Sequence, residues 1–270
     1  MTAVEQLANE PVLLRDTLED GIVRLTLNRP KAANSLSHDL VHSLHAAFLD
    51  LANDETVRVV ILAGAGKNFC AGHDLTESIA AAKDPASKRE ANIAASAMIM
   101  AINRCPKPVI ARIQGVATAA GCQLAASCDL VFASTEARFA TPGVNIGLWC
   151  LAPQVAVSRA IAPKHAMQML LTGKMIDAAT AVRFGLVNEA VAPDALDARL
   201  LEIAREIASK SAPAVAMGKE SFYRQLEMDV PGAYAMVDEL IYGAIQTDDA
   251  QEGISAFLEK RKPVWKGRNQ

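Results

Sequence analysis

The sequence predicts an α/β fold followed by a helical carboxyl-terminal region, and three observations support this prediction. Residues 57–62 are almost continuously apolar, which is typical of a strand covered on both faces. Residues 108–113 form a second short, β-branched run, and residues 114–132 read as a small-residue turn, a helix and another strand. Helical periodicity dominates the later part of the chain. We therefore expect a core over residues 1–195 and a helical region over residues 196–270.

The amino-terminal part is expected to alternate strands and helices. Residues 1–11 read as a loose lead, and residues 21–27 alternate apolar and polar side chains, as in a half-buried strand. Ser37 is placed to cap a helix whose apolar residues follow at helical spacing. Residues 64–75 then form a long loop at the carboxyl end of an apolar strand, where ligand sites of strand–helix proteins are commonly found.

Residues 79–92 are expected to be mobile, because they are polar and alanine-rich and Pro85 interrupts them. A helix from about Glu90 to Asn103 should follow. After a short strand near residues 138–140, we expect helices near residues 153–161, 164–171, 178–184, 195–209, 213–226, 231–245 and 249–259, with a strand at residues 187–191.

Composition limits the function classes. The chain has 270 residues, 51% hydrophobic residues, a mean hydropathy of +0.16 and a formal net charge of −3. This charge predicts no attraction to nucleic acid or to an anionic membrane. The chain start lacks the apolar stretch of a signal peptide, and no pair of cysteines has redox or metal spacing. We expect a cytoplasmic protein without a metal, whose cysteines stay reduced: Cys70, Cys105, Cys122, Cys128 and Cys150.

The small-residue turn over residues 115–121 is the first candidate for a functional site. A helix that begins in such a turn presents unpaired backbone N–H groups, and its dipole adds partial positive charge there. Small residues also let a polar ligand approach the backbone closely. The turn could therefore hold an anion or a developing oxyanion. A tightly packed turn between buried elements is an equally good interpretation of this stretch alone.

Several motifs, in order along nearly the whole chain, resemble the crotonase (enoyl-CoA hydratase/isomerase) superfamily. They are NRPKAANSL at 28–36, NFCAGHDL at 68–75, the stretch from Gly115 to Leu130, LTG at 171–173, AVRFGLV at 181–187 and FLEKRKP at 257–263. The resemblance implies a spiral of ββα units and a helical tail, with trimers paired into hexamers. It also implies a lyase of fatty acid metabolism that binds an acyl-CoA thioester and needs no separate cofactor, since CoA is part of the substrate.

The resemblance also implies positions for the site. The thioester oxygen should lie between the backbone N–H groups of His73 and Ala120, where one such donor is worth roughly 3–4 kcal/mol in other enzymes. CoA should run along residues 31–36 and 71–76. For the basic residues among the implied positions (Arg29, Lys31 and Lys260), the alternative interpretation is a solvated surface charge. The implied substrate-binding residues are Arg29, Lys31, Ala33, Ala71, Asp74, Leu75, Thr76, Asn145, Trp149, Phe257 and Lys260.

Two positions depart from the family pattern. Hydratases of this family use two glutamates as acid and base, and here Gln123 and Gly143 occupy those positions. A glutamine can orient water by hydrogen bonding but does not exchange protons near neutral pH, and a glycine supplies no group. His73 is the candidate replacement, because an imidazole can act as acid or base. Its alternative role is packing or a hydrogen bond to Asp74. Cys150 is expected to shape an apolar pocket rather than act as a nucleophile.

Three functions remain open at this stage. The first is an acyl-CoA enzyme that uses the oxyanion site without the glutamate pair, such as a hydrolase, a decarboxylase or an unusual lyase. The second is a non-catalytic acyl-CoA-binding or regulatory protein on the same scaffold. The third is the RNA binding found in some relatives of this fold, which the net charge of −3 disfavours. We favour the enzyme.

Overall fold

A computed structural model describes residues 10–267, so most of the predicted lead lies outside the described residues. Its main feature is a sheet with the strand order β1-β2-β3-β4-β6-β9, in which only the β1–β2 pair is antiparallel. The predicted α/β fold is confirmed. The strands are β1 (Leu13–Thr17), β2 (Ile22–Leu27), β3 (Val59–Gly64), β4 (Val109–Ile113), β6 (Leu130–Ser134) and β9 (Glu189–Val191).

A second, smaller sheet lies after the main strands. It joins β5 (Val116–Thr118), β7 (Arg138–Ala140) and β8 (Ile176–Asp177) in the order β5-β7-β8. Two isolated bridges, Cys70 to Ala117 and Leu36 to His73, continue the same edge. The strands β2, β3, β4 and β6 are each followed by a short crossing segment and then a helix, which is the arrangement of ββα units that the resemblance implies.

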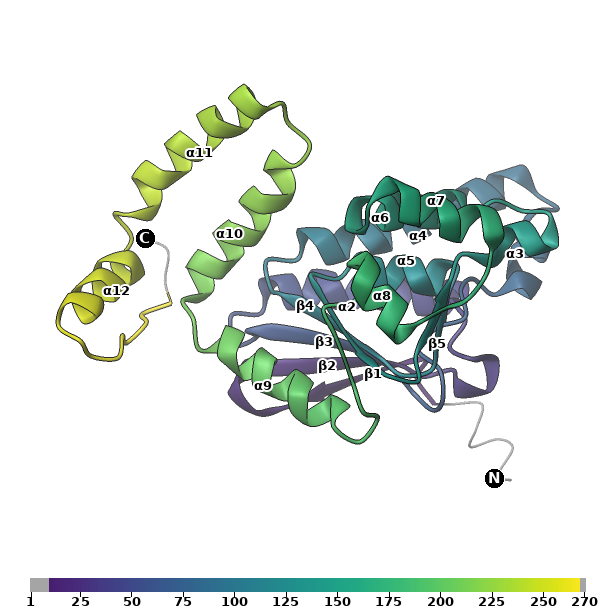
Figure 1. The fold of residues 1–270 in the computed structure, drawn as a ribbon, viewed down its shortest axis with the longest axis horizontal. Coiled ribbons are helices and arrows are strands. Elements are labelled where there is room, and N and C mark those ends of the chain that lie inside the picture. The colour runs from purple at the N-terminus through teal and green to yellow at the C-terminus, as the bar shows by residue number, and fades with distance from the viewer. Residues whose placement is uncertain (1–9, 268–270) are drawn as a thin grey trace.

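Helices cover both faces of the main sheet (Figure 1). On one face, Leu196, Leu200 and Ala204 of α9 pack against apolar strand residues that include Ile61 and Ile110. The opposite face contributes to the larger core cluster. The helices are α2 (His38–Asn53), α3 (Leu75–Ala81), α4 (Pro85–Arg104), α5 (Ala120–Ala126), α6 (Leu151–Ala160), α7 (Pro163–Thr172), α8 (Ala178–Phe184), α9 (Leu196–Ala208), α10 (Ala212–Gln225), α11 (Val230–Ala244) and α12 (Asp248–Leu258).

Residues 79–92 belong to α3 and α4 apart from a turn at residues 82–84, and the early start of α4 has a local cause. Asp84 accepts hydrogen bonds from the N–H groups of Ala86 and Ser87 and so caps α4. Pro85 occupies the first turn, where its missing N–H group removes no helical hydrogen bond. The proline therefore begins the helix instead of interrupting it, and α4 starts before the predicted Glu90.

The helices α10, α11 and α12 form an arm that projects away from the core (Figure 1). No residue of α10 or α11 is buried. The arm is attached by Asp129, whose carboxylate accepts hydrogen bonds from Lys219 Nζ at 2.7 Å and Tyr223 Oη at 2.8 Å. Asp129 thus has a structural role, since it joins the arm to the core. Within residues 10–267, no helix combines the length and the apolar character needed to cross a membrane.

Candidate active site

The small sheet brings the 68–75 loop to the start of α5. Thr118 donates its N–H to the carbonyl of Cys70 at 3.0 Å and its hydroxyl to the carbonyl of Ala71 at 3.1 Å. A methyl group placed on Gly72 would lie 2.9 Å from the Ala119 Cβ and 3.4 Å from the Ala120 nitrogen. The two peptide segments that should carry the donors therefore lie in close contact, although they are distant in the sequence.

Both expected donor N–H groups lack a hydrogen-bond partner within the described residues. Leu36 pairs with the residues flanking His73: its N–H donates to Gly72, and its carbonyl accepts from Asp74. In a parallel bridge of this kind, the N–H of the central residue points away from the partner strand. Ala120 is the first residue of α5, where helical N–H groups lack an intrahelical partner. Neither N–H group donates to an acceptor among residues 10–267.

Gly121 permits this close approach. A Cβ atom at Gly121 would lie 2.1 Å from the carbonyl oxygen of Cys70, well inside van der Waals contact. Only glycine avoids this clash without moving one of the two segments. The first turn of α5 can therefore pack directly on the backbone of the 68–75 loop.

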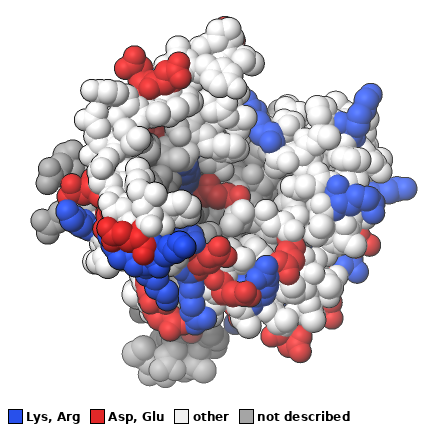
Figure 2. All heavy atoms as spheres, turned by 60° about the vertical axis from the view of Figure 1, so that its left-hand side comes forward, with Lys and Arg blue, Asp and Glu red and all other residues white. Residues whose placement is uncertain are grey.

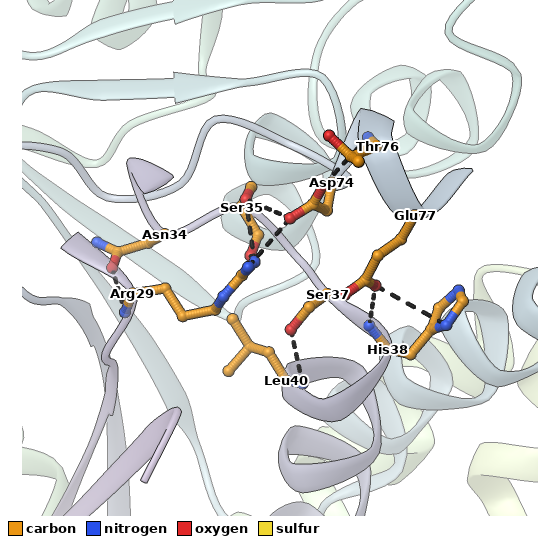
Figure 3. Close-up of polar contacts among 9 residues, drawn as sticks. All are labelled: Arg29, Asn34, Ser35, Ser37, His38, Leu40, Asp74, Thr76 and Glu77. Atoms are coloured by element: carbon orange, nitrogen blue, oxygen red, sulfur yellow. Dashed lines mark hydrogen bonds and ion pairs between the residues drawn. The ribbon is translucent and has the colours of Figure 1, made fainter. Parts of the chain in front are cut away.

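The 28–36 loop is tied to the site by an ion pair (Figure 3). Arg29 Nη2 lies 3.0 Å from Asp74 Oδ2, and Arg29 Nη1 donates to the Ser35 carbonyl at 2.6 Å. Asp74 also caps α3 through the N–H of Thr76. The hydrogen bond from Arg29 holds the pKa of Asp74 below its usual range. Arg29, implied to bind substrate by the resemblance, is thus engaged within the chain.

Three polar residues of this region were not singled out from the sequence. Asn34 is fully buried and donates to the carbonyls of Ala65 and Asn68 at 2.9 and 2.8 Å. Ser35 hydrogen-bonds to Arg29, and Glu77 accepts from the N–H of His38 at 2.7 Å (Figure 3). These partners are far apart in sequence. The turn-forming Asn34-Ser35 pair within the 28–36 motif was the only local signal.

The CoA segments lie side by side, as the resemblance implies. Ala71 donates its N–H to the Ala33 carbonyl at 3.0 Å, which joins residues 31–36 to residues 71–76. Lys31, Leu75 and Thr76 are exposed along this edge. The positions at the carboxyl end are not brought here within one chain. Phe257 and Lys260 lie at the end of α12, on the opposite side of the molecule from α3 (Figure 1).

His73 is an exposed residue, and its side chain makes no hydrogen bond to Asp74. It lines a cavity of about 520 Å³ bounded by α2, α3 and α4, together with His38, His42, Glu77 and Lys88. Desolvation in the cavity wall, and then the positive charges of Lys88 and His38, lower the pKa of His73. The imidazole therefore favours its neutral form near pH 7. Asp74 is instead bound to Arg29.

The two positions at which the resemblance implies glutamates lie in α5 and in the loop after β7. Gln123 is 8% exposed, and its side-chain amide has no hydrogen-bond partner among the described residues. Gly143 donates its N–H to Cys150 Sγ at 3.3 Å, and a Cβ atom there would lie 3.0 Å from that sulfur. Burial raises the pKa of the Cys150 thiol, so this sulfur is a poor nucleophile at neutral pH.

The remaining pocket residues are engaged in local contacts. Trp149 Nε1 donates to Gln154 Oε1 at 2.7 Å, and Asn145 Nδ2 donates to the Gly173 carbonyl at 3.3 Å. Burial also raises the pKa of the Cys122 thiol to about 12. Within the described part of the chain, no group of three or more His, Cys, Asp or Glu residues is arranged to hold a metal ion.

Comparison with known proteins connects this geometry to a family. The family model described as enoyl-CoA hydratase/isomerase matches residues 17–268. The mouse protein named enoyl-CoA hydratase domain-containing protein 3, mitochondrial, is 41% identical over 257 residues, which cover 95% of this chain and 85% of the mouse protein. The short-chain-enoyl-CoA hydratase of Clostridium acetobutylicum is 35% identical over 246 residues, covering 90% and 94% of the two chains.

Solved structures agree with the sequence comparisons. The crystal structure of an enoyl-CoA hydratase from Mycobacterium smegmatis superposes with a TM-score of 0.92 at 49% identity, and the match covers 95% of this chain and 99% of that one. Human enoyl coenzyme A hydratase domain-containing protein 3 superposes with a TM-score of 0.90 at 42% identity, covering 95% and 100% of the two chains.

Proposed function

We propose a function for this chain, which belongs to the enoyl-CoA hydratase/isomerase family of crotonase-fold proteins and whose relatives indicate that it is an enzyme. In this proposal, the protein stabilises the enolate of an acyl-CoA thioester between the N–H groups of His73 and Ala120. The observation that carries this proposal is the convergence of the two segments, with neither N–H bound to another described residue. Preformed donors of this kind stabilise charge that develops on a carbonyl oxygen.

The reaction we propose does not use the two-glutamate hydration route. Gln123 cannot exchange a proton near neutral pH, and Gly143 has no side chain. The space beside Gly143 is occupied by the sulfur of Cys150. His73, whose backbone N–H is one of the two proposed donors, also carries a titratable imidazole that favours its neutral form. A decarboxylase or a lyase that needs only enolate stabilisation and one proton carrier is consistent with these residues. A hydrolase is also consistent with them, with the two donors holding the tetrahedral oxyanion that forms when water attacks the thioester carbon.

A non-catalytic acyl-CoA-binding protein is the second candidate. The engagement of Arg29 with Asp74 and the absence of both carboxylates favour it, since the scaffold could bind a thioester without changing it. The two candidates predict the same binding and different turnover. They also differ in how activity responds to removal of the His73 imidazole.

The test is mass-spectrometric turnover of a panel of acyl-CoAs, crotonyl-CoA included, with calorimetric binding of the same compounds. The proposal expects binding of several acyl-CoAs and a product from at least one, with turnover lost in His73→Ala while binding persists. Rapid hydration of crotonyl-CoA by wild type would contradict the exclusion of the two-glutamate route. Binding of the whole panel without any product would favour the non-catalytic protein.

The proposal includes a homotrimer or a dimer of trimers in the cytoplasm. It assigns Phe257 and Lys260 to the CoA site of a neighbouring subunit, because their own chain holds them far from His73 (Figure 1). The vertebrate relatives are named mitochondrial. Cell fractionation with an antibody to the protein tests the cytoplasmic location.

A further inference from the structure

Ala119, the residue before the second donor, has a backbone conformation that alanine rarely adopts. Its φ is 49° and its ψ is −119°. These are the angles of the first central residue of a type II′ turn, a position dominated by glycine because a Cβ atom there is crowded by the backbone. Such conformations persist only where the surrounding structure imposes them, and they cluster at functional sites.

The surroundings of Ala119 impose this conformation from both sides. Its N–H donates to the carbonyl of Ala140 at 3.0 Å, which fixes the turn to the end of β7. Its own carbonyl accepts from the N–H of Gln123 at 3.0 Å and begins the hydrogen bonding of α5. Thr118, the preceding residue, is held to Cys70. The peptide that presents the Ala120 N–H therefore has little freedom to rotate.

The Ala119 methyl group lies against the first donor segment. A Cβ atom on Gly72 would lie 2.9 Å from the Ala119 Cβ, closer than two carbon atoms can approach. Gly72 itself has a φ of 105°, which only glycine adopts readily. One methyl group therefore fills the space between the two segments, and a second would not fit. The methyl group that is present belongs to Ala119, in the turn before α5.

We propose that Ala119 is a positioning residue whose strained backbone and methyl group together set the separation of the His73 and Ala120 N–H groups. This inference rests on the proposed function, because it concerns the spacing of that donor pair. It predicts that the strain is retained for function. Replacing Ala119 with glycine should relieve the strain, stabilise the fold and loosen the site.

The experiment compares wild type with Ala119→Gly, using a cinnamoyl-CoA that carries an electron-donating para substituent. When a donor pair polarises its thioester carbonyl, the absorption band of this probe moves to longer wavelength. Asp20→Gly is the matched control, because Asp20 also has a positive φ of 57° but lies in an exposed turn between β1 and β2. Thermal unfolding and calorimetric binding of the probe are measured for all three proteins.

We expect Ala119→Gly to raise the thermal midpoint by roughly 2–4 °C. It should bind the probe with little change in affinity and lose most of the red shift, whereas Asp20→Gly keeps the full red shift. For any acyl-CoA that is turned over, kcat should fall about tenfold with little change in KM. A full red shift in Ala119→Gly, or a lower thermal midpoint, would overturn the positioning role of Ala119 and leave the proposed donor pair standing. A wild-type protein that binds the probe without a red shift would refute the donor pair, and with it the positioning role of Ala119.

Discussion

The packing around Gly143 explains why a side chain at this position is difficult to accommodate. A Cβ atom there would lie 3.0 Å from Cys150 Sγ and 3.0 Å from the Leu148 carbonyl oxygen. The Gly143 N–H donates to the same sulfur, which closes the loop after β7. The loop is thus built around a missing side chain, and a glutamate cannot be restored here without moving Cys150.

We therefore expect Gly143→Ala to destabilise the protein by about 1–3 kcal/mol through overpacking. The matched control is Gly218→Ala in α10, where a Cβ atom would meet nothing within 4 Å. Alanine has the higher helix propensity, so this control should stabilise by about 0.5–1 kcal/mol. Urea unfolding measures both variants. Equal effects of the two substitutions would contradict the packing described at Gly143.

His73 gives the site a pH dependence whose sign follows from its lowered pKa. Near and below the unfolded value of about 6.5, the unfolded chain binds more protons than the folded one. Stability should therefore fall as the pH drops from 7 through that region. His73→Asn should flatten this part of the stability curve, while His45→Asn, outside the cavity, should not. Urea unfolding at a series of pH values would contradict this account if both variants followed wild type.

At the scale of the element, the arm is held to the core by a few polar contacts. Lys219, whose side chain is 7% exposed, donates to the carbonyls of Ile102 and Lys107 as well as to Asp129. Asp129 also accepts from the N–H of Val109 at 2.6 Å. The ion pair between Lys219 and Asp129 therefore connects α10 to the start of β4 and to the residue that precedes β6.

Lys219→Met should destabilise the protein by about 3–5 kcal/mol, because it leaves the Asp129 carboxylate without its cation in a largely buried position. Lys210→Met is the control, since Lys210 makes only an exposed ion pair with Glu206 and should change stability by less than about 0.5 kcal/mol. Guanidinium unfolding compares the two. A small effect at Lys219 would mean that apolar contacts attach the arm.

The sequence predicted those elements whose signals are local. The continuous apolar run of β3 and the small-residue turn before α5 both identified their structure. The predicted start of α4 was wrong, because Pro85 was interpreted as a helix breaker. Asp84 caps the helix, so Pro85 lies in its first turn. The strand β1 was missed, since three of its five residues are exposed and the strand shows little periodicity.

The site residues could be predicted from the sequence only where they belong to a motif that resembles the family. The resemblance identified His73 and Ala120, whose segments the structure brings together. It did not predict that Arg29 would pair with Asp74, because that contact depends on where two loops meet in the folded chain. The strain at Ala119 likewise has no sequence signal beyond an alanine in a small-residue turn.

At the scale of the whole molecule, the arm carries an exposed apolar surface. Figure 2 shows a face on which acidic and basic side chains are mixed and large uncharged areas cover the arm. The inner side of the arm forms a mostly apolar groove of about 930 Å³ between α10, α11 and α12. Exposed apolar patches of this kind mark interaction surfaces. The large exposed side chains of the arm include Phe222, Tyr234, Ile241, Phe257 and Leu258.

Sedimentation at micromolar concentration should therefore give three or six times the chain mass of 28.7 kDa. The double variant Ile241→Asp, Phe257→Asp should shift the mass toward a single chain, because it places two charges in an apolar contact. Lys262→Ala, a change of charge just beyond α12, is the control and should sediment like wild type. A monomeric wild type would rule out the proposed assembly and the sharing of Phe257 between subunits.

The most direct test of the central claim is the carbon-13 chemical shift of a thioester carbonyl bound to the wild-type protein. An acyl-CoA labelled at the carbonyl carbon and lacking a reactive double bond is titrated into the protein. If the N–H groups of His73 and Ala120 hold the oxygen, the resonance moves downfield on binding, as it does for a polarised carbonyl. A bound thioester whose carbonyl resonance stays at its value in water would contradict the account.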